Sequence, residues 1–318
     1  MAVVGIDLGG TKTAGLVLHD GKIEERYRQE TDASSQESVL QGLLEVCSYL
    51  LEWAGSRGIG VDAVGLGIAG FIDFERGVVT DAPNHPLRDA PVRDILEEKS
   101  GLPTFVDNDA NVAALAEARM GAGKGSRHLV HLTLGTGIGG GIIMDGKIYR
   151  GALGAAAELG HMIILEDGPP CNCGAKGCLE SLASGIAIYR RVKELAESGV
   201  RTPAIEAFLA DPEIFDAQAL CRFADDGDDR AREILEDAGR HLGTGVAGLV
   251  NIFNPDAVTL SGGLLGCYHL MEERMRISFE GSAIPISRRH VRILTGTLGD
   301  DGGLLGAALL ASETMSGS

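Results

Sequence analysis

The sequence has few aromatic residues, few prolines and no long apolar run. Aromatic residues make up 4% of its 318 residues, and there are only 10 prolines. No apolar stretch approaches the roughly 18 residues needed to cross a bilayer, and the N-terminus lacks the basic and long apolar regions of a signal peptide. We therefore expect a cytoplasmic protein with no membrane partner.

Positive charge is also scarce. The chain carries 28 lysines and arginines against 45 acidic residues, for a formal net charge of −17. Without a run of Lys or Arg to form a basic patch, attraction to a nucleic-acid backbone is unfavourable. The sequence therefore predicts no nucleic-acid partner.

Glycine and aliphatic residues are abundant instead. The hydrophobic content of 44% is enough to bury one large core or two moderate ones. The 46 glycines have no collagen-like period and gather at a few junctions between predicted strands. We expect two α/β domains around a cleft, with glycines where backbone must approach closely.

A strand, a glycine turn and a second strand occur twice. The first copy has apolar strands at 3–7 and 14–18, and the second at 128–134 and 142–144. Each copy ends in an Asp-Gly dipeptide typical of a hairpin turn. The pattern predicts a duplicated unit.

Helices and further strands follow from the spacing of apolar residues. Helical spacing predicts helices over 40–54, 91–101, 179–197, 228–253 and from 302 to the C-terminal end. Short apolar runs predict strands at 61–68, 104–106, 257–260 and 291–294.

The second glycine turn matches the G-x-G-x-x-G spacing of dinucleotide sites, from Gly135 to Gly140. That interpretation needs a helix directly after the glycines, whereas a strand follows here. Backbone N–H groups of Gly135 and Gly137 and the Thr136 hydroxyl could instead approach phosphate oxygens. A purely structural glycine hairpin remains equally open from this motif alone.

The first glycine turn offers a matching set of groups. Asp7 could hold Mg²⁺ through water, and the turn that follows could face phosphates. The residues of this turn are Gly9, Gly10, Thr11 and Lys12. Two such turns, one in each predicted domain, favour phosphate binding over a structural role.

A short cysteine motif follows the second turn. Three thiolates and one imidazole can complete a tetrahedral zinc shell, and they come from His161, Cys171, Cys173 and Cys178. A disulfide is disfavoured because a cytoplasmic chain keeps its thiols reduced. Four protein ligands leave no open position, so the metal would be structural. The solitary Cys47, Cys221 and Cys267 are expected to pack in apolar surroundings.

Taken together, the two turns resemble the actin, hexokinase and heat-shock chaperone ATPase superfamily. The segment Glu158-Leu-Gly-His161, followed by Cys171-Asn-Cys173-Gly-Ala-Lys-Gly-Cys178-Leu-Glu180, looks like the signature of the ROK family of bacterial sugar kinases and repressors. The resemblance runs nearly end to end and is strongest to ATP-dependent glucokinases.

The resemblance implies an actin-like fold of two α/β domains, each with a mixed sheet and flanking helices. Residues 1–115 with the C-terminal helix, about 302–318, would form the smaller domain. Residues 116–301 would form the larger one, with the zinc motif and the second phosphate turn. A homodimer or homotetramer is also implied.

Taken alone, Asp109 is more typical of a helix N-cap. The resemblance reverses that interpretation and implies a catalytic base at Asp109. A helix N-terminus there is expected to keep the carboxylate ionised. The sugar would contact Gly70, Asn84, Asn108, Asp109, Glu158, His161 and Glu180. Taken alone, the two glutamates could equally be solvated or capping acids. Adenine would lie against Gly262 and Gly263, although a plain strand-to-helix turn needs the same residues.

The implied reaction is ATP-dependent phosphorylation of a hexose at its 6-hydroxyl, most simply glucose, with Mg²⁺ and a structural Zn²⁺. Other ROK kinases, for N-acetylmannosamine, N-acetylglucosamine, fructose or allose, share these motifs. The sequence departs from the usual family pattern at Gly67-Ile68-Ala69-Gly70 and after Asn84, at His85-Pro86. A sugar-responsive repressor is disfavoured because the first phosphate turn leaves no room before it for a helix-turn-helix module. A polyphosphate-using glucokinase is disfavoured by the cysteine motif and the low basicity.

Overall fold

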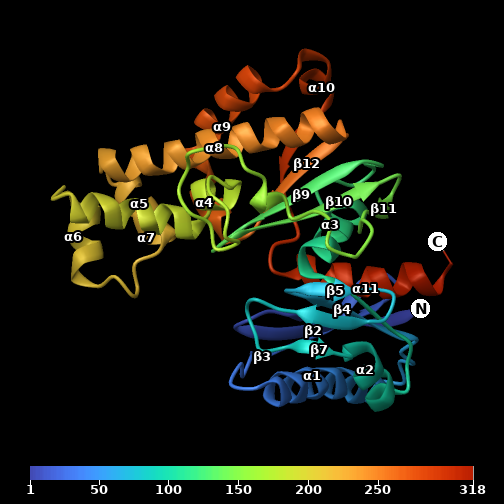
Figure 1. Cartoon of the computed structure of the whole chain (residues 1–318). Coiled ribbons are helices and arrows are strands. Elements are labelled where there is room, and N and C mark those ends of the chain that lie inside the picture. The colour runs from blue at the N-terminus through green and yellow to red at the C-terminus, as the bar shows by residue number, and fades with distance from the viewer. Residues whose placement is uncertain (318) are drawn as a thin grey trace. The chain divides into compact units, whose positions relative to one another are not determined.

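The computed structural model describes residues 1–317, which form two compact units (Figure 1). The first unit contains 1–127, 141–157 and 297–317, and the second contains 128–140 and 158–296. None of the helices within 1–317 is long and apolar enough to span a bilayer.

The main sheet of the first unit has the strand order β3-β2-β1-β4-β8. The central strands β1 and β4 are almost entirely buried and pair in parallel, as expected for strands covered on both faces. The edge strand β3 alternates exposed and half-buried residues. The five strands are β1 (Ala2–Leu8), β2 (Lys12–His19), β3 (Lys22–Glu30), β4 (Ala63–Ile68) and β8 (Thr104–Asn108).

Helices cover both faces of this sheet (Figure 1). α1 (Gln36–Ser56) buries Leu43 and Leu50 in the core on one face, where α2 (Val92–Ser100) also packs. On the other face, α11 (Asp301–Met315) lies so close that a Cβ on Gly65 would collide with the Ala307 carbonyl oxygen. α11 also packs on α3 (Asp109–Arg119), which follows β8 directly. The sheet therefore fixes where α3 begins.

A small antiparallel sheet in the first unit was not expected from the sequence. Its strands are β5 (Phe71–Asp73), β6 (Val78–Asp81) and β7 (Arg88–Ala90). Each has only three or four residues, and most of their side chains are not fully buried. Such short strands leave no apolar alternation long enough to detect.

The second main sheet has the strand order β11-β10-β9-β12-β13. β12 pairs in parallel with both β9 and β13, which makes it a buried central strand. The strands predicted at 128–134, 257–260 and 291–294 are confirmed with small changes of boundary. The strand predicted at 142–144 begins four residues earlier than expected, so the glycine turn is shorter, and β11 was not predicted. The five strands are β9 (Leu129–Leu134), β10 (Ile138–Met144), β11 (Lys147–Ile148), β12 (Ala257–Ser261) and β13 (Arg292–Thr295).

The second unit is rich in helices. The single helix predicted at 179–197 is in fact two helices that meet at Ser184. The Ser184 hydroxyl accepts a hydrogen bond from the Ala187 N–H and so caps the second helix. The helices are α4 (Leu179–Ala183), α5 (Gly185–Glu197), α6 (Pro203–Ala210), α7 (Ala217–Asp225), α8 (Asp229–Phe253), α9 (Tyr268–Ser282) and α10 (Pro285–His290), with short 3-10 turns η1 (Leu159–His161) and η2 (Gly263–Cys267).

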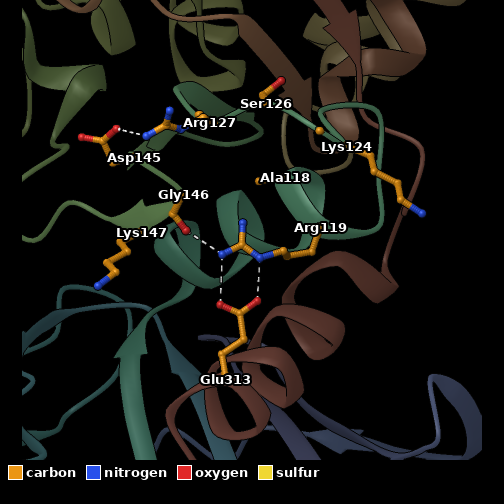
Figure 2. A pocket seen from close by; sticks show the side chains of 10 residues that line it. Ala118, Arg119, Lys124, Ser126, Arg127, Asp145, Gly146, Lys147 and Glu313 are labelled. Carbon is orange, nitrogen blue, oxygen red and sulfur yellow. Dashed lines mark hydrogen bonds and ion pairs between the residues drawn. The ribbon is translucent and has the colours of Figure 1, made fainter. Parts of the chain in front are cut away.

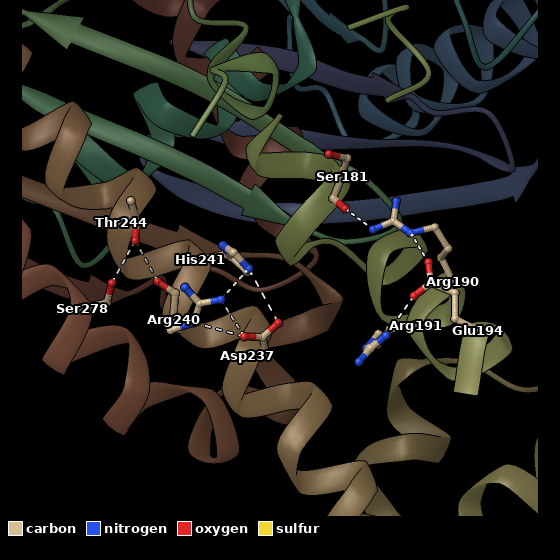
Figure 3. A network of polar contacts seen from close by, with 9 residues as sticks. All are labelled: Ser181, Arg190, Arg191, Glu194, Asp237, Arg240, His241, Thr244 and Ser278. Carbon is tan, nitrogen blue, oxygen red and sulfur yellow. Dashed lines mark hydrogen bonds and ion pairs between the residues drawn. The ribbon is translucent and has the colours of Figure 1, made fainter. Parts of the chain in front are cut away.

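Polar contacts hold these helices in place (Figure 3). Between α8 and α9, the hydroxyls of Thr244 and Ser278 are 2.9 Å apart. Within α8, contact with His241 and hydrogen bonds from Arg240 lower the pKa of the Asp237 carboxyl. Arg190 of α5 donates to the Ser181 carbonyl oxygen and so ties α5 to α4. These contacts join α8 to α9 and α5 to α4, the helix that begins directly after Cys178.

Candidate functional site

The predicted site residues fall into two groups, one in each unit, and each group forms a well-defined local structure. The first group surrounds the turn between β1 and β2. Gly9 N–H donates to the Lys12 carbonyl oxygen at 2.9 Å, and the Thr31 hydroxyl donates to the Gly9 carbonyl oxygen at 3.0 Å. A Cβ on Gly10 would lie 2.8 Å from the Asn84 carbonyl oxygen. The turn is thus closed by its neighbours and sits against Asn84.

Asp7 lies at the end of β1 next to this turn. Burial raises the pKa of its carboxyl to about 7, the nearby Asp109 carboxylate adds to the rise, and Lys12 opposes it. Two buried carboxylates without a sufficient cation are unfavourable. A divalent cation would offset that repulsion, so these residues fit a Mg²⁺ site.

Asn108, not Asp109, is the N-cap of α3. The Asn108 side-chain oxygen accepts from Ala110 N–H at 2.9 Å and from Asn111 N–H at 3.3 Å. Its amide nitrogen donates to the Gly70 carbonyl oxygen at 3.1 Å. The alternative interpretation of Asp109 as the cap is therefore wrong, and Asn108 joins Gly70 to the helix start.

Asp109 is the first residue of α3. Burial raises the pKa of its carboxyl, while hydrogen bonds from the backbone N–H of Ala110 and from Asn108 oppose the rise. Desolvation therefore outweighs the opposing hydrogen bonds at the start of the helix. A carboxylate with a raised pKa is the more effective proton acceptor.

The second group surrounds the turn between β9 and β10. The N-terminal N–H groups of α5 hold it, since Gly185 donates to the Gly135 carbonyl oxygen at 2.9 Å and Ile186 donates to the Thr136 carbonyl oxygen at 3.1 Å. The Glu180 carboxylate accepts from Ile138 N–H at 3.0 Å, just after Gly137. Glu180 therefore belongs to the turn as well as to α4.

The four predicted metal ligands form a single cluster. One ligand atom from each of His161, Cys171, Cys173 and Cys178 lies within 4.8 Å of the other three. The Cys171 sulfur is 3.6 Å from His161 Nδ1, and the Cys173 and Cys178 sulfurs are 3.7 Å apart, too far for a disulfide bond. The donor set suits a tetrahedral transition-metal ion.

The other ring nitrogen of His161 lies near Glu158, another predicted sugar residue. His161 Nε2 lies 4.0 Å from a Glu158 carboxylate oxygen. With Nδ1 directed at the thiols, the imidazole joins the metal cluster to Glu158. A metal ion bound by these four ligands would fix the orientation of His161 relative to Glu158.

The predicted adenine turn follows β12. Gly262 has φ +93° and would bring any Cβ into the Leu134 carbonyl oxygen, so only glycine fits there. Gly263 has open space instead, and its carbonyl oxygen accepts from the Gln218 side chain at 2.7 Å. The turn is held by α7 yet leaves bare backbone at Gly263.

Comparison with known proteins shows which family this fold and sequence match. Residues 3–314 match the ROK family. The chain is 36% identical to a glucokinase from Thermotoga maritima, covering 100% of this chain and 99% of that protein. It is 36% identical, with a TM-score of 0.83, to a ROK glucokinase from Streptomyces griseus whose structure contains glucose and AMPPNP, covering 98% and 100%. A xylose repressor from Caldicellulosiruptor bescii is 32% identical, covering 99% of this chain and 79% of the repressor.

The chain belongs to the ROK family. Its architecture is the actin-like, hexokinase-type ATPase fold that the sequence predicted. The ROK resemblance drawn from the cysteine segment is thereby confirmed. The assignments of individual residues remain proposals.

Some contacts at the start of α3 were not predicted from the sequence. Arg150 forms an ion pair with the buried Asp107 at 2.7 Å. The other Asp107 oxygen accepts from Asn108 N–H and from the Asn111 side chain. These contacts fix the first turn of α3, and the only sequence signal was that Asp107 precedes Asn108 and Asp109.

A concave pocket in the first unit lies at the other end of α3 (Figure 2). Arg119 there pairs with both carboxylate oxygens of Glu313, and Arg127 pairs with Asp145. None of the predicted ROK site residues lines this pocket.

Proposed function

We propose that this chain is an ATP-dependent glucokinase that transfers the γ-phosphoryl group of ATP to the 6-hydroxyl of glucose. The observation that carries the proposal is the full-length likeness to glucokinases, combined with Asp109, both glycine turns and the Cys/His cluster in this chain. A cytoplasmic location and a homodimer or homotetramer accompany the proposal.

In this proposal the two glycine turns hold the nucleotide. Backbone N–H groups and the hydroxyls of Thr11 and Thr136 approach phosphate oxygens, and Lys12 supplies a positive charge. Asp7 would hold Mg²⁺ through water, and the bound ion would supply neutralisation of charge at the transferred phosphoryl group. Gly262 and Gly263 offer flat backbone to the adenine.

Asp109 orients the attacking hydroxyl and accepts its proton. In phosphoryl transfer most of the rate comes from alignment and charge neutralisation, so the base acts late. The raised pKa of Asp109 supports this role, because the carboxylate then accepts the proton readily as the hydroxyl oxygen begins to bond to the γ-phosphorus of ATP. Arg150 and Asp107 act as positioning residues by fixing the start of α3.

The remaining sugar hydroxyls would meet side chains that both donate and accept hydrogen bonds. In the first unit these are Asn84 and Asn108, with the Gly70 backbone against the ring. In the second unit they are Glu158, His161 and Glu180. Amides and carboxylates suit a neutral polyol.

We further propose that the Cys/His cluster holds a structural zinc ion. Three thiols and an imidazole nitrogen lie close enough to share one ion, and such a shell leaves no position for a reactive water. Its role would be to hold the loop at 167–177 and to orient His161.

The proposed domains are 1–115 with the C-terminal helix, about 302–318, and 116–301. Among the alternatives, another ROK sugar kinase keeps the same machinery and differs only in the sugar. A sugar-responsive regulator is the alternative of another class, raised by the 32% identity to a xylose repressor. The carboxylates of Asp7 and Asp109 and both turns favour the kinase over the regulator.

The proposal is tested by identifying the product. Purified protein with Mg-ATP and isotopically labelled glucose should give glucose 6-phosphate by NMR, with one ADP formed per sugar. Phosphate on another hydroxyl would reject the proposed orientation of the sugar. ADP formed without any sugar phosphate would reject the kinase assignment.

A further inference from the structure

A second group of metal-binding side chains lies in the second unit, apart from the predicted zinc ligands. Cys221 and Asp225 come from α7, and His269 comes from the first turn of α9. One ligand atom from each lies within 4.8 Å of the other two, and His269 Nε2 is 3.0 Å from Asp225 Oδ1. Cys221 is buried, whereas Asp225 and His269 are exposed.

We propose that Cys221, Asp225 and His269 form a second transition-metal site, of the type that binds zinc. A thiolate, a carboxylate and an imidazole are the three ligand types that zinc takes in proteins. Three protein ligands leave one position for water or an exogenous ligand. This site would therefore exchange its metal more readily than the enclosed Cys/His cluster.

The backbone already fixes these ligands. Cys221 and Asp225 are one helical turn apart and share a face of α7. The Cys221 sulfur is 3.7 Å from the Gly266 carbonyl oxygen, and the Cys267 sulfur is 3.3 Å from the Ala217 carbonyl oxygen. These contacts hold α7 against the junction of η2 and α9, where His269 lies. An ion would find its ligands assembled before it binds.

An ordinary surface ion pair explains less of this arrangement. A solvent-exposed His–Asp pair contributes little to stability and needs no third partner. Here the sulfur of the buried Cys221 lies within 4.8 Å of the ligand atoms of both partners, and the Cys267 side chain contacts that sulfur. Packing alone accounts for a buried cysteine, but not for its convergence with a carboxylate and an imidazole.

The site connects to the predicted adenine turn, and this part of the inference rests on the proposed function. η2 begins at Gly263, and Gln218 of α7 donates to the Gly263 carbonyl oxygen. Metal held between α7 and α9 would stiffen the support of that turn. The expected effect is a change in the KM for ATP with little change in the KM for sugar.

The first experiment counts metal. Reduced wild-type protein equilibrated with excess Zn²⁺ and passed through a desalting column should retain about two zinc ions per chain by mass spectrometry, and the Asp225→Asn and His269→Gln variants about one. Asp226→Asn is the matched control, since this neighbouring exposed carboxylate lies outside the cluster, and it should bind as much zinc as wild type.

The second experiment uses Co²⁺ to test for sulfur ligation. Cobalt-loaded wild type should show more thiolate-to-metal charge-transfer absorption than cobalt-loaded Cys221→Ser. Equal zinc content in wild type and both variants would overturn the proposal, as would equal cobalt spectra. Thiol titration showing a Cys221–Cys267 disulfide in the purified protein would overturn it too. Metal content is measured without turnover, so failure of this site and failure of the kinase assignment are distinguishable.

Discussion

The Glu180 carboxylate accepts a hydrogen bond from the backbone N–H of Ile138 at 3.0 Å, and its other oxygen lies 3.7 Å from the Cys171 sulfur. One side chain thus contacts both the glycine turn that ends at Ile138 and the cluster of metal ligands. Cys178 directly precedes α4, which carries Glu180. We infer that metal binding and the geometry of the phosphate turn are coupled through this residue.

Replacing Glu180 separates its two contacts. Glu180→Gln keeps an oxygen that can accept from Ile138 but removes the charge, whereas Glu180→Ala removes both. Hydrogen bonds to charged groups contribute about 1.5–3 kcal/mol, so each variant should raise the KM for sugar by roughly 10- to 100-fold. Only the Ala variant should also raise the KM for ATP. Steady-state kinetics check this, and equal KM values for ATP in the two variants would contradict the coupling.

Cys173→Ser should lower the zinc content and raise the KM for sugar, because the loop and His161 lose the ion that holds them. Metal analysis and kinetics on the same preparation provide the test. Asp167→Asn, an exposed change in the same loop, is the control and should leave both values unchanged. A Cys173→Ser protein with full zinc content and normal kinetics would disprove the ligand assignment.

Asp109→Asn should leave the fold and zinc content intact and lower kcat by roughly 10²- to 10⁴-fold, the range expected for loss of a general base. Circular dichroism and metal analysis establish that the variant is folded. Asp94→Asn is the matched control, since Asp94 is an exposed carboxylate in the first turn of α2. Wild-type turnover in the Asp109 variant would remove Asp109 from the mechanism.

His131 predicts a specific acid sensitivity. Burial lowers the pKa of its imidazole to about 4, and its contacts with Thr133, Thr259 and Ser261 are all to neutral hydroxyls. As the pH falls below about 6.5, His131 becomes protonated in the unfolded chain but stays neutral in the folded chain until about pH 4. The free energy of unfolding therefore decreases over this range. The loss from this group is at most about 1.4 kcal/mol per pH unit.

Urea unfolding between pH 4 and 7 measures the effect against His131→Gln, which can hydrogen-bond but does not titrate. The wild type should lose more stability than the variant as the pH falls. If the free energy of unfolding depends on pH equally in the wild type and the variant, His131 is not buried in its neutral form.

The parts of the fold that could be predicted are those with long regular patterns. β1 and α8 have apolar residues at the spacing of a strand and a helix over their whole lengths, and both are confirmed. The break at Ser184 was missed because the apolar pattern continues across it, and only contacts with the Gly135 turn show that α5 begins anew. Local pattern carries no information about such contacts.

The candidate site also has some features that the sequence predicts and others that it does not. The Cys171 segment could be predicted because its ligands lie close together in sequence and keep metal-binding spacing. The ion pair of Arg150 with Asp107 could not, because 43 residues separate them. The N-cap role considered for Asp109 belongs to Asn108, because Asn and Asp both favour that position and only the hydrogen bonds of Asn108 distinguish them.

The most direct test of the central claim is a comparison of kcat/KM for ADP release with Mg-ATP and glucose, N-acetylmannosamine, N-acetylglucosamine, mannose, fructose and allose. Zinc-replete protein should prefer glucose by at least about tenfold, a difference of about 1.4 kcal/mol in transition-state binding. Preference for another sugar would contradict glucose as the substrate but agree with the assignment as a sugar kinase. No sugar-dependent ADP release across the panel would contradict the kinase itself.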